Sequence, residues 1–181
     1  MGLRDRREHR RQEREAFGRR GNAVQYRMRQ KLVSIGNDYW IEDAAGERVF
    51  RVDGKALRLR DTWVLKDISG QEVAKIRERK LSLRDALTID IGDRHATVKK
   101  AFIGIRDRFH VEVDGGQDLK VHGNVVDHEY EIERDGRRVA TISKKWFRIR
   151  DTYGVAVQDP VDVPLALSIT VAVDALAHDR G

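Results

Sequence analysis

The chain has 181 residues, enough for one domain with a real hydrophobic core, and charged residues make up 36% of it. It contains no cysteine, which excludes disulfides, thiolate catalysis and cysteine-based zinc sites and suits a reducing cytosol. The net charge of +6 lies in residues 1–31, which hold 11 basic and 4 acidic side chains, whereas the remainder holds 25 and 26.

Residues 1–22 are predicted to form a basic arm, mobile or helical, because they contain almost no apolar side chains to bury. They also lack the apolar run of a secretory signal. A solvated charge run explains this arm, and so does contact with a polyanion or a membrane. In the second case the contacting side chains are expected to be Arg6, Arg7, Arg10, Arg11 and Arg14.

From Val24 onward, apolar and polar residues alternate in short runs, and glycines interrupt them every 8–12 residues or so. This period of two predicts an antiparallel meander of about a dozen strands within one domain, residues 23–181. The later strands are expected at residues 73–78, 86–91, 95–100, 108–113, 119–123, 129–134, 138–144 and 153–158.

The middle of the chain contains an internal repeat with an offset of 66 residues. Gly70 corresponds to Gly136, Val73 to Val139, Ile76 to Ile142, and Arg84 to Arg150. Two copies of one β unit predict a closed or doubled sheet with pseudo-symmetry, and they do not suggest a single asymmetric catalytic cleft.

The last segment, residues 163–177, is predicted to be a helix that is apolar on every face and therefore surrounded by protein. It is about 21 Å long at 1.5 Å per residue. That is shorter than a bilayer core of about 30 Å, so a buried helix is favoured over a transmembrane span. A barrel of about twelve strands is too wide for its own side chains to fill. We therefore expect a mainly β fold, a closed antiparallel barrel that encloses its C-terminal helix.

Several blocks of the sequence resemble the LURP-one-related family, in the same order and over most of the chain after the arm. They are Tyr26–Asp43, Val49–Lys55, Val98–Phe102, Val121–Asn124, Tyr130–Ile132 and Ile142–Gly154. The resemblance implies a fold related to the Tubby C-terminal domain and the phospholipid scramblases, a twelve-stranded barrel around a hydrophobic helix. Tubby domains bind phosphoinositide headgroups through basic surface residues, and scramblase relatives act at membranes. The cysteine-rich segment of the scramblases and a calcium loop are absent.

Basic residues near strand ends are the candidate anion-binding residues, because phosphate groups are bound by convergent cations and by the bidentate guanidinium of arginine. The alternative is a wet outer barrel face on which acidic residues balance them. Lys144-Lys145-Trp146 also suits a membrane interface, or a strand with Trp146 packed inward. The candidates are Lys99, Lys100, Lys144, Lys145, Arg148, Arg150, Arg58 and Arg60.

No catalytic site, metal site or cofactor is predicted. The serines lack a nucleophile elbow, and no phosphate-cradling glycine motif occurs. His122 and His128 straddle a turn and can approach each other, but no metal-ligand spacing emerges, and surface or turn histidines are expected. A buried carboxylate such as that of Asp174, in the apolar helix, must be paired, hydrogen-bonded or neutral. We expect it to reach a barrel arginine or backbone donors, with a pH-sensing or ligand role as the alternative.

The sequence thus favours a non-enzymatic, cytoplasmic binding module that associates with anionic phospholipid or phosphoinositide-like headgroups, peripherally at the inner face of the membrane. A protein-interaction scaffold and a small-ligand carrier that uses the barrel lumen are the alternatives. Nucleic acid is a weaker hypothesis, since no RNA-binding signature of aromatics in a strand is present.

Overall fold

The structure is a computed structural model that describes residues 23–29, 39–57, 60–79, 86–101, 108–146, 152–158 and 163–178. Its elements, in chain order, are β1 (Val24–Arg29), β2 (Tyr39–Asp43), β3 (Arg48–Leu57), β4 (Arg60–Asp67), β5 (Glu72–Glu78), β6 (Ala86–Ile91), β7 (Arg94–Ala101), β8 (Arg108–Val113), β9 (Leu119–Asn124), β10 (Glu129–Arg134), β11 (Arg137–Ser143), the 3-10 helix η1 (Lys144–Trp146), β12 (Thr152–Val157) and the helix α2 (Val163–His178).

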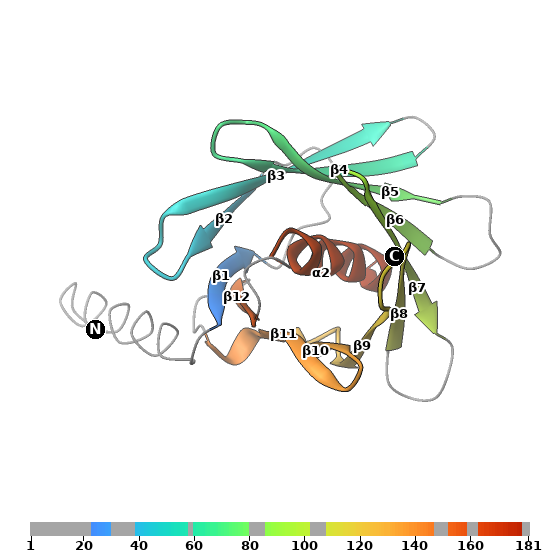
Figure 1. Cartoon of the computed structure of the whole chain (residues 1–181). Helices are drawn as coiled ribbons and strands as arrows, with labels where there is room; N and C mark the ends of the chain where they lie inside the picture. The colour runs from blue at the N-terminus through green and yellow to red at the C-terminus, as the bar shows by residue number, and fades with distance from the viewer. Residues whose placement is uncertain are drawn as a thin grey trace.

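The strands form one closed antiparallel barrel in which every strand pairs with its neighbours in sequence. The ring is closed by β1 and β12, whose register runs from Val24 opposite Val157 to Arg29 opposite Thr152. Figure 1 shows α2 in the middle of this ring, with β3 to β6 above it and β9 to β11 below. The predicted mainly β, twelve-stranded barrel with a helix in its lumen is therefore confirmed.

Alternation along the strands separates the core from the outer face, as a period of two requires. In β8, Phe109 and Val111 are buried, whereas His110 between them is partly exposed. In β5, Ala74 and Ile76 are buried while Lys75 and Arg77 face outward. The barrel wall thus presents an apolar inner surface to α2 and a charged outer surface to solvent.

The internal repeat corresponds to two hairpins, β4–β5 and β10–β11, whose second strands lie six positions apart around the barrel. Gly70 and Gly136 both turn their hairpins with positive φ, +86° and +72°, a conformation that glycine adopts without a steric penalty. Ile76 and Ile142, the matching positions of the two copies, are both buried in the core. The two copies of the repeat therefore form equivalent hairpins in the two halves of the strand order.

Helix α2 packs against the inward faces of β5, β6, β7 and β12. From Leu165 to Leu176 its side chains are buried, which is why an all-round apolar sequence is stable as a helix here. Because α2 occupies the barrel axis, the small-ligand carrier hypothesis receives no support. No helix within the described ranges is long and apolar enough to cross a membrane.

Candidate functional site

The adjacent candidates Lys99 and Lys100, near the end of β7, point to opposite sides of the barrel wall. Lys99 faces outward, and its Nζ lies 2.6 and 2.7 Å from the carboxylate oxygens of Glu112 on β8. Lys100 is only 7% exposed, and its Nζ lies 5.7 Å from the centre of the Phe109 ring. The structure does not bring this pair together on one surface, and the charge of Lys99 is balanced.

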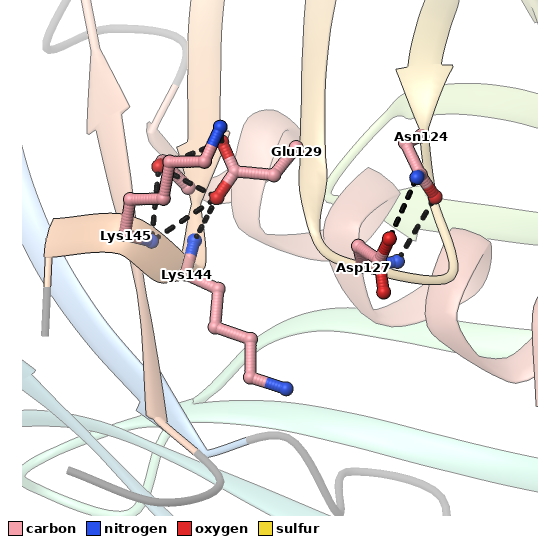
Figure 2. Close-up of polar contacts among 6 residues, drawn as sticks. Asn124, Asp127, Glu129, Lys144 and Lys145 are labelled. Carbon is pink, nitrogen blue, oxygen red and sulfur yellow. Dashed lines mark hydrogen bonds and ion pairs between the residues drawn. The ribbon is translucent and has the colours of Figure 1, made fainter. Parts of the chain in front are cut away.

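Lys144 and Lys145 lie in η1, directly after β11, where Glu129 holds the backbone (Figure 2). The Glu129 carboxylate accepts hydrogen bonds from the backbone N–H groups of Lys144 and Lys145, at 3.0 and 3.1 Å, and from Ser143. The Lys145 Nζ is 3.8 Å from the same carboxylate. Trp146 belongs to this short helix and is half-buried, so the expected inward-facing strand position is wrong for it.

The remaining candidates fall largely outside the described residues. This applies to Arg58, Arg148, Arg150 and the whole predicted arm, including Arg6, Arg7, Arg10, Arg11 and Arg14. Arg60 opens β4, but its side chain also lies outside what the structure describes. Their role in anion binding stays a prediction.

The outer face of β8 and β9 carries four basic side chains in a square, which we call the β8–β9 patch: Arg108, His110, Lys120 and His122. Antiparallel pairing places Arg108 opposite His122 and His110 opposite Lys120. Within each strand the two residues are separated by two positions and so project from the same face. Side chains directly opposite on adjacent strands have Cβ atoms about 4.5–5.5 Å apart, so the four groups converge.

The β8–β9 patch lines a recess of about 440 Å³ that also reaches Phe109 and Gly123. His110 and His122 each have a carboxylate partner, since His110 Nε2 lies 3.1 Å from Asp118 and His122 Nε2 lies 3.1 Å from Glu133. Arg108 and Lys120 are exposed, and neither forms an ion pair with an acid inside the described ranges. The recess therefore offers two available cations beside two imidazoles.

Several cations on β1 to β5 are instead paired with neighbouring acids. The Asp53 carboxylate, for example, accepts ion pairs from Arg51 at 2.7 Å and Lys66 at 2.5 Å. Burial acts to raise the pKa of Asp53, but the hydrogen bonds from Lys66 and Arg51 outweigh it, and the pKa lies below its ordinary value. The same outward pairing occurs in Arg27–Glu42, Arg77–Asp90 and Lys75–Glu72.

A second polar group lies inside the barrel, around Asp174 of α2, which is fully buried. The Tyr153 hydroxyl donates a 2.7 Å hydrogen bond to Asp174 Oδ2, and His128 Nε2 lies 3.3 Å from Oδ1. The His128 ring stacks on Tyr153 with centroids 4.4 Å apart. Asp174 is paired, as expected, and its partners among the described residues include a tyrosine and a histidine of the barrel wall.

Burial and the Asp174 charge together hold three tyrosines in their neutral form. Tyr39, Tyr130 and Tyr153 surround the cluster, and the pKa of each is well above its ordinary value, chiefly because burial disfavours the phenolate and secondly because Asp174 repels it. This arrangement stabilises the core of the barrel and is closed to solvent. It is a structural cluster and gives a ligand no access.

His122 and His128 do not approach one another, because they lie on opposite sides of the barrel wall. His122 faces outward and its side chain is 43% exposed, whereas His128 is fully buried at a φ of +53°. His128 is a turn residue, as expected of a surface or turn histidine, but its side chain is buried. The turn between them includes Asn124, whose side-chain oxygen accepts the Asp127 N–H at 3.1 Å (Figure 2).

Sequence patterns missed the β8–β9 patch, although its signal is present as Arg108-Phe-His110 and Lys120-Val-His122. Each triplet places two basic groups on one face of a strand. Only the register shows that the two pairs face each other, and only the side-chain partners show which cations are balanced. Ion pairing across strands therefore determines which of these basic side chains are available to bind an anion.

The family model described as LURP-one-related matches residues 24–174, which is most of the chain. Among solved structures, a crystal structure of a protein from Arabidopsis thaliana is similar, with a TM-score of 0.56 and 16% sequence identity. The alignment covers 86% of this chain and 92% of that one, and at this identity it shows a shared fold alone. Among the curated proteins, none matches the sequence.

Proposed function

The chain belongs to the LURP-one-related family, and from this premise we propose that it is a non-enzymatic binding module that associates with anionic phospholipid headgroups through the β8–β9 patch. The observation that carries the proposal is the pair of available cations, Arg108 and Lys120, at the recess of about 440 Å³. Elsewhere on the described surface many cations, such as Arg51, Lys66 and Arg77, are paired with acids, whereas Arg108 and Lys120 form no ion pair with a described acid.

The chemistry of the patch suits a phosphate group. The Arg108 guanidinium can donate two parallel hydrogen bonds to phosphate oxygens, and Lys120 adds a compact charge beside it. The imidazoles of His110 and His122 provide further donors. The arm supplies long-range attraction to an anionic leaflet, because its basic residues outnumber its acidic ones.

The energy involved is modest. A basic residue near an anionic membrane surface contributes about 1 kcal/mol. Loss of both Arg108 and Lys120 therefore removes about 2 kcal/mol, which corresponds to about 30-fold in affinity. Because the interaction is between exposed charges, binding falls as salt concentration rises.

The test is co-sedimentation of the full chain with vesicles of phosphatidylcholine, with and without phosphatidylserine or phosphatidylinositol phosphates, at low salt. Arg108→Gln/Lys120→Gln should reduce binding to anionic vesicles by about 30-fold. The matched control is Lys75→Gln/Arg77→Gln, which removes the same two charges from the outward face of β5, where both are already paired. It should bind almost as the wild type does.

Deletion of residues 1–22 separates the arm from the patch and should weaken binding without removing its dependence on Arg108 and Lys120. Competition by inorganic phosphate distinguishes a free anion from a lipid surface. Equal binding of both double variants, or equal binding to neutral vesicles, contradicts the proposal. In that case a salt-resistant protein partner becomes the better hypothesis.

A further inference from the structure

A cluster of three metal-ligating side chains lies on the outer face of β9 and β10, next to the β8–β9 patch. His122 on β9 is directly opposite Glu131 on β10, and Glu133 follows two residues later on the same strand. Ile132, between the two glutamates, and Val121, next to His122, are buried in the core. Alternation therefore forces the imidazole and both carboxylates onto one surface.

The three side chains are already close to the spacing that a metal ion requires. One ligand atom from each of His122, Glu131 and Glu133 can be chosen so that all three lie within 4.8 Å of one another. A tetrahedral zinc ion with bonds of about 2.1 Å places its ligand atoms about 3.4 Å apart. The His122 Nε2 and Glu133 Oε2 atoms, at 3.1 Å, already meet that spacing.

Exposure leaves the side chains room to adjust without disturbing the core. The His122 side chain is 43% exposed, and those of Glu131 and Glu133 are each 29% exposed. Pairing with β9 and β11 fixes the backbone at Glu131, and movement of the exposed His122 and Glu133 side chains can close the remaining gap while Glu131 keeps its contact with Arg138. The two strands thus hold the ligand set, and only side chains need to move.

We propose that His122, Glu131 and Glu133 form a binding site for a divalent transition-metal ion, with Zn²⁺ as the best match. One imidazole and two carboxylates form a nitrogen and oxygen donor set that Zn²⁺ accepts, and three protein ligands leave a fourth position for water or an anion. Glu133 also lines a second recess, of about 540 Å³, that includes Lys120. The ligand set therefore borders an open recess whose lining includes Lys120 and the acidic residues Asp118 and Asp135.

Arg138 on β11 orients one of the ligands. Its guanidinium lies 2.9 Å from Glu131 Oε1. A carboxylate has two oxygens, so Glu131 keeps Arg138 on Oε1 and offers Oε2 to the metal. Such outer partners hold a ligating carboxylate in place.

This site rests on its own residues and stands independently of lipid binding. It shares His122 with the β8–β9 patch, but its carboxylates belong to β10, and Arg108 and Lys120 take no part in coordination. A bound Zn²⁺ adds two positive charges beside the recess. Substitutions can therefore remove one site and leave the other, whereas the charge of a bound Zn²⁺ links the two sites electrostatically.

The experiment uses the full chain without an affinity tag, stripped with a chelator and titrated with Zn²⁺ against a chromophoric competitor. The wild type should bind one equivalent with a dissociation constant of about 10 μM or less, or about −7 kcal/mol. His122→Ala and Glu133→Gln should each weaken binding by more than about tenfold. Co²⁺ should give an absorption band typical of nitrogen and oxygen ligands, which the same substitutions remove.

The matched control is His95→Ala, because His95 is exposed, lies outside both sites, and is paired with a carboxylate, that of Asp90. It should leave Zn²⁺ affinity unchanged. Circular dichroism checks that each variant keeps the barrel. Absence of binding by the wild type at 1:1 stoichiometry below about 100 μM, or unchanged affinity of the His122→Ala variant, overturns the proposal.

Discussion

Two histidine–carboxylate pairs lie on opposite sides of the same barrel wall, and their histidines are only six residues apart in the chain. His128 and Asp174 are fully buried, with a tyrosine hydroxyl on the carboxylate and a tyrosine ring on the imidazole. His122 and Glu133 have a similar separation, 3.1 Å against 3.3 Å, but their side chains are 43% and 29% exposed. The chemistry is the same and the environments differ.

The comparison shows that burial assigns these pairs their roles. A buried polar group must be satisfied by protein, so loss of one partner leaves a desolvated group and costs stability. An exposed pair exchanges freely with water, so it contributes little to stability. It remains open to ligands. The inner pair, His128 and Asp174, therefore stabilises the fold, whereas the outer pair, His122 and Glu133, is available to bind a ligand.

Alkaline pH should produce the largest effect on the inner side of the wall. All four tyrosines, Tyr26, Tyr39, Tyr130 and Tyr153, have a raised pKa in the folded protein. Their contribution to the free energy of unfolding is therefore complete at pH values below the tyrosine pKa of the unfolded chain, about 10. This contribution is lost as the pH rises above that pKa. We expect no phenolate absorbance from Tyr39, Tyr130 and Tyr153 near pH 10 in the folded protein, and then one cooperative step as the barrel unfolds. A gradual titration of these three tyrosines before unfolding would contradict the closed cluster.

Removal of the inner carboxylate should have the next largest effect. Asp174→Ala leaves the Tyr153 hydroxyl and the His128 imidazole without their carboxylate in the core, and we expect a loss of about 3–5 kcal/mol in the free energy of unfolding. Urea unfolding measures it. Asp174→Asn, which keeps an acceptor for Tyr153, should lose less, and equal losses would show that the hydrogen bond is unimportant.

The backbone that separates the two pairs should also be sensitive. A Cβ at Gly123, where φ is +136°, would lie 2.5 Å from the Glu129 carbonyl oxygen. Gly123→Ala should therefore cost about 3 kcal/mol, at the upper end for backbone strain, because rigid backbone must move. Gly70→Ala is the control: its φ is also positive, but nothing lies within 4 Å, so about 1 kcal/mol is expected. Thermal or urea unfolding of both variants distinguishes the close approach from the dihedral angle.

Substitution of the outer pair should have the smallest effect on stability. Glu133→Gln removes an exposed ion pair, so the free energy of unfolding should change by less than about 0.5 kcal/mol. Its effect should appear in Zn²⁺ binding instead. A loss above about 2 kcal/mol would show that the outer pair is structural and would remove the distinction between the two sides.

Much of the fold could be predicted from the sequence because a period of two and a helix apolar all round are strong local signals. The strands at Ala86–Ile91, Arg108–Val113 and Glu129–Arg134 begin and end where predicted, and α2 differs by one residue at its end. Trp146 was placed wrongly because η1 depends on Glu129, a contact across strands that no local pattern contains.

The candidate sites were harder to predict because they depend on register and on pairing. The sequence shows that Lys99 and Lys100 are basic neighbours, but not that one is paired with Glu112 and the other is buried. It shows His122 without showing that Glu131 lies opposite. Spacing along the chain identifies faces of strands, whereas cross-strand geometry identifies sites.

The position of α2 at the centre of the barrel has a consequence for biosynthesis. When β1 to β11 have been synthesised, the helix α2 that occupies the lumen has not. At that stage β1 also lacks its partner β12, which follows about 130 residues later in the chain. Proteins dominated by such distant contacts fold slowly, and their exposed strand edges invite aggregation meanwhile. We therefore expect the nascent chain to depend on chaperones until its last helix emerges.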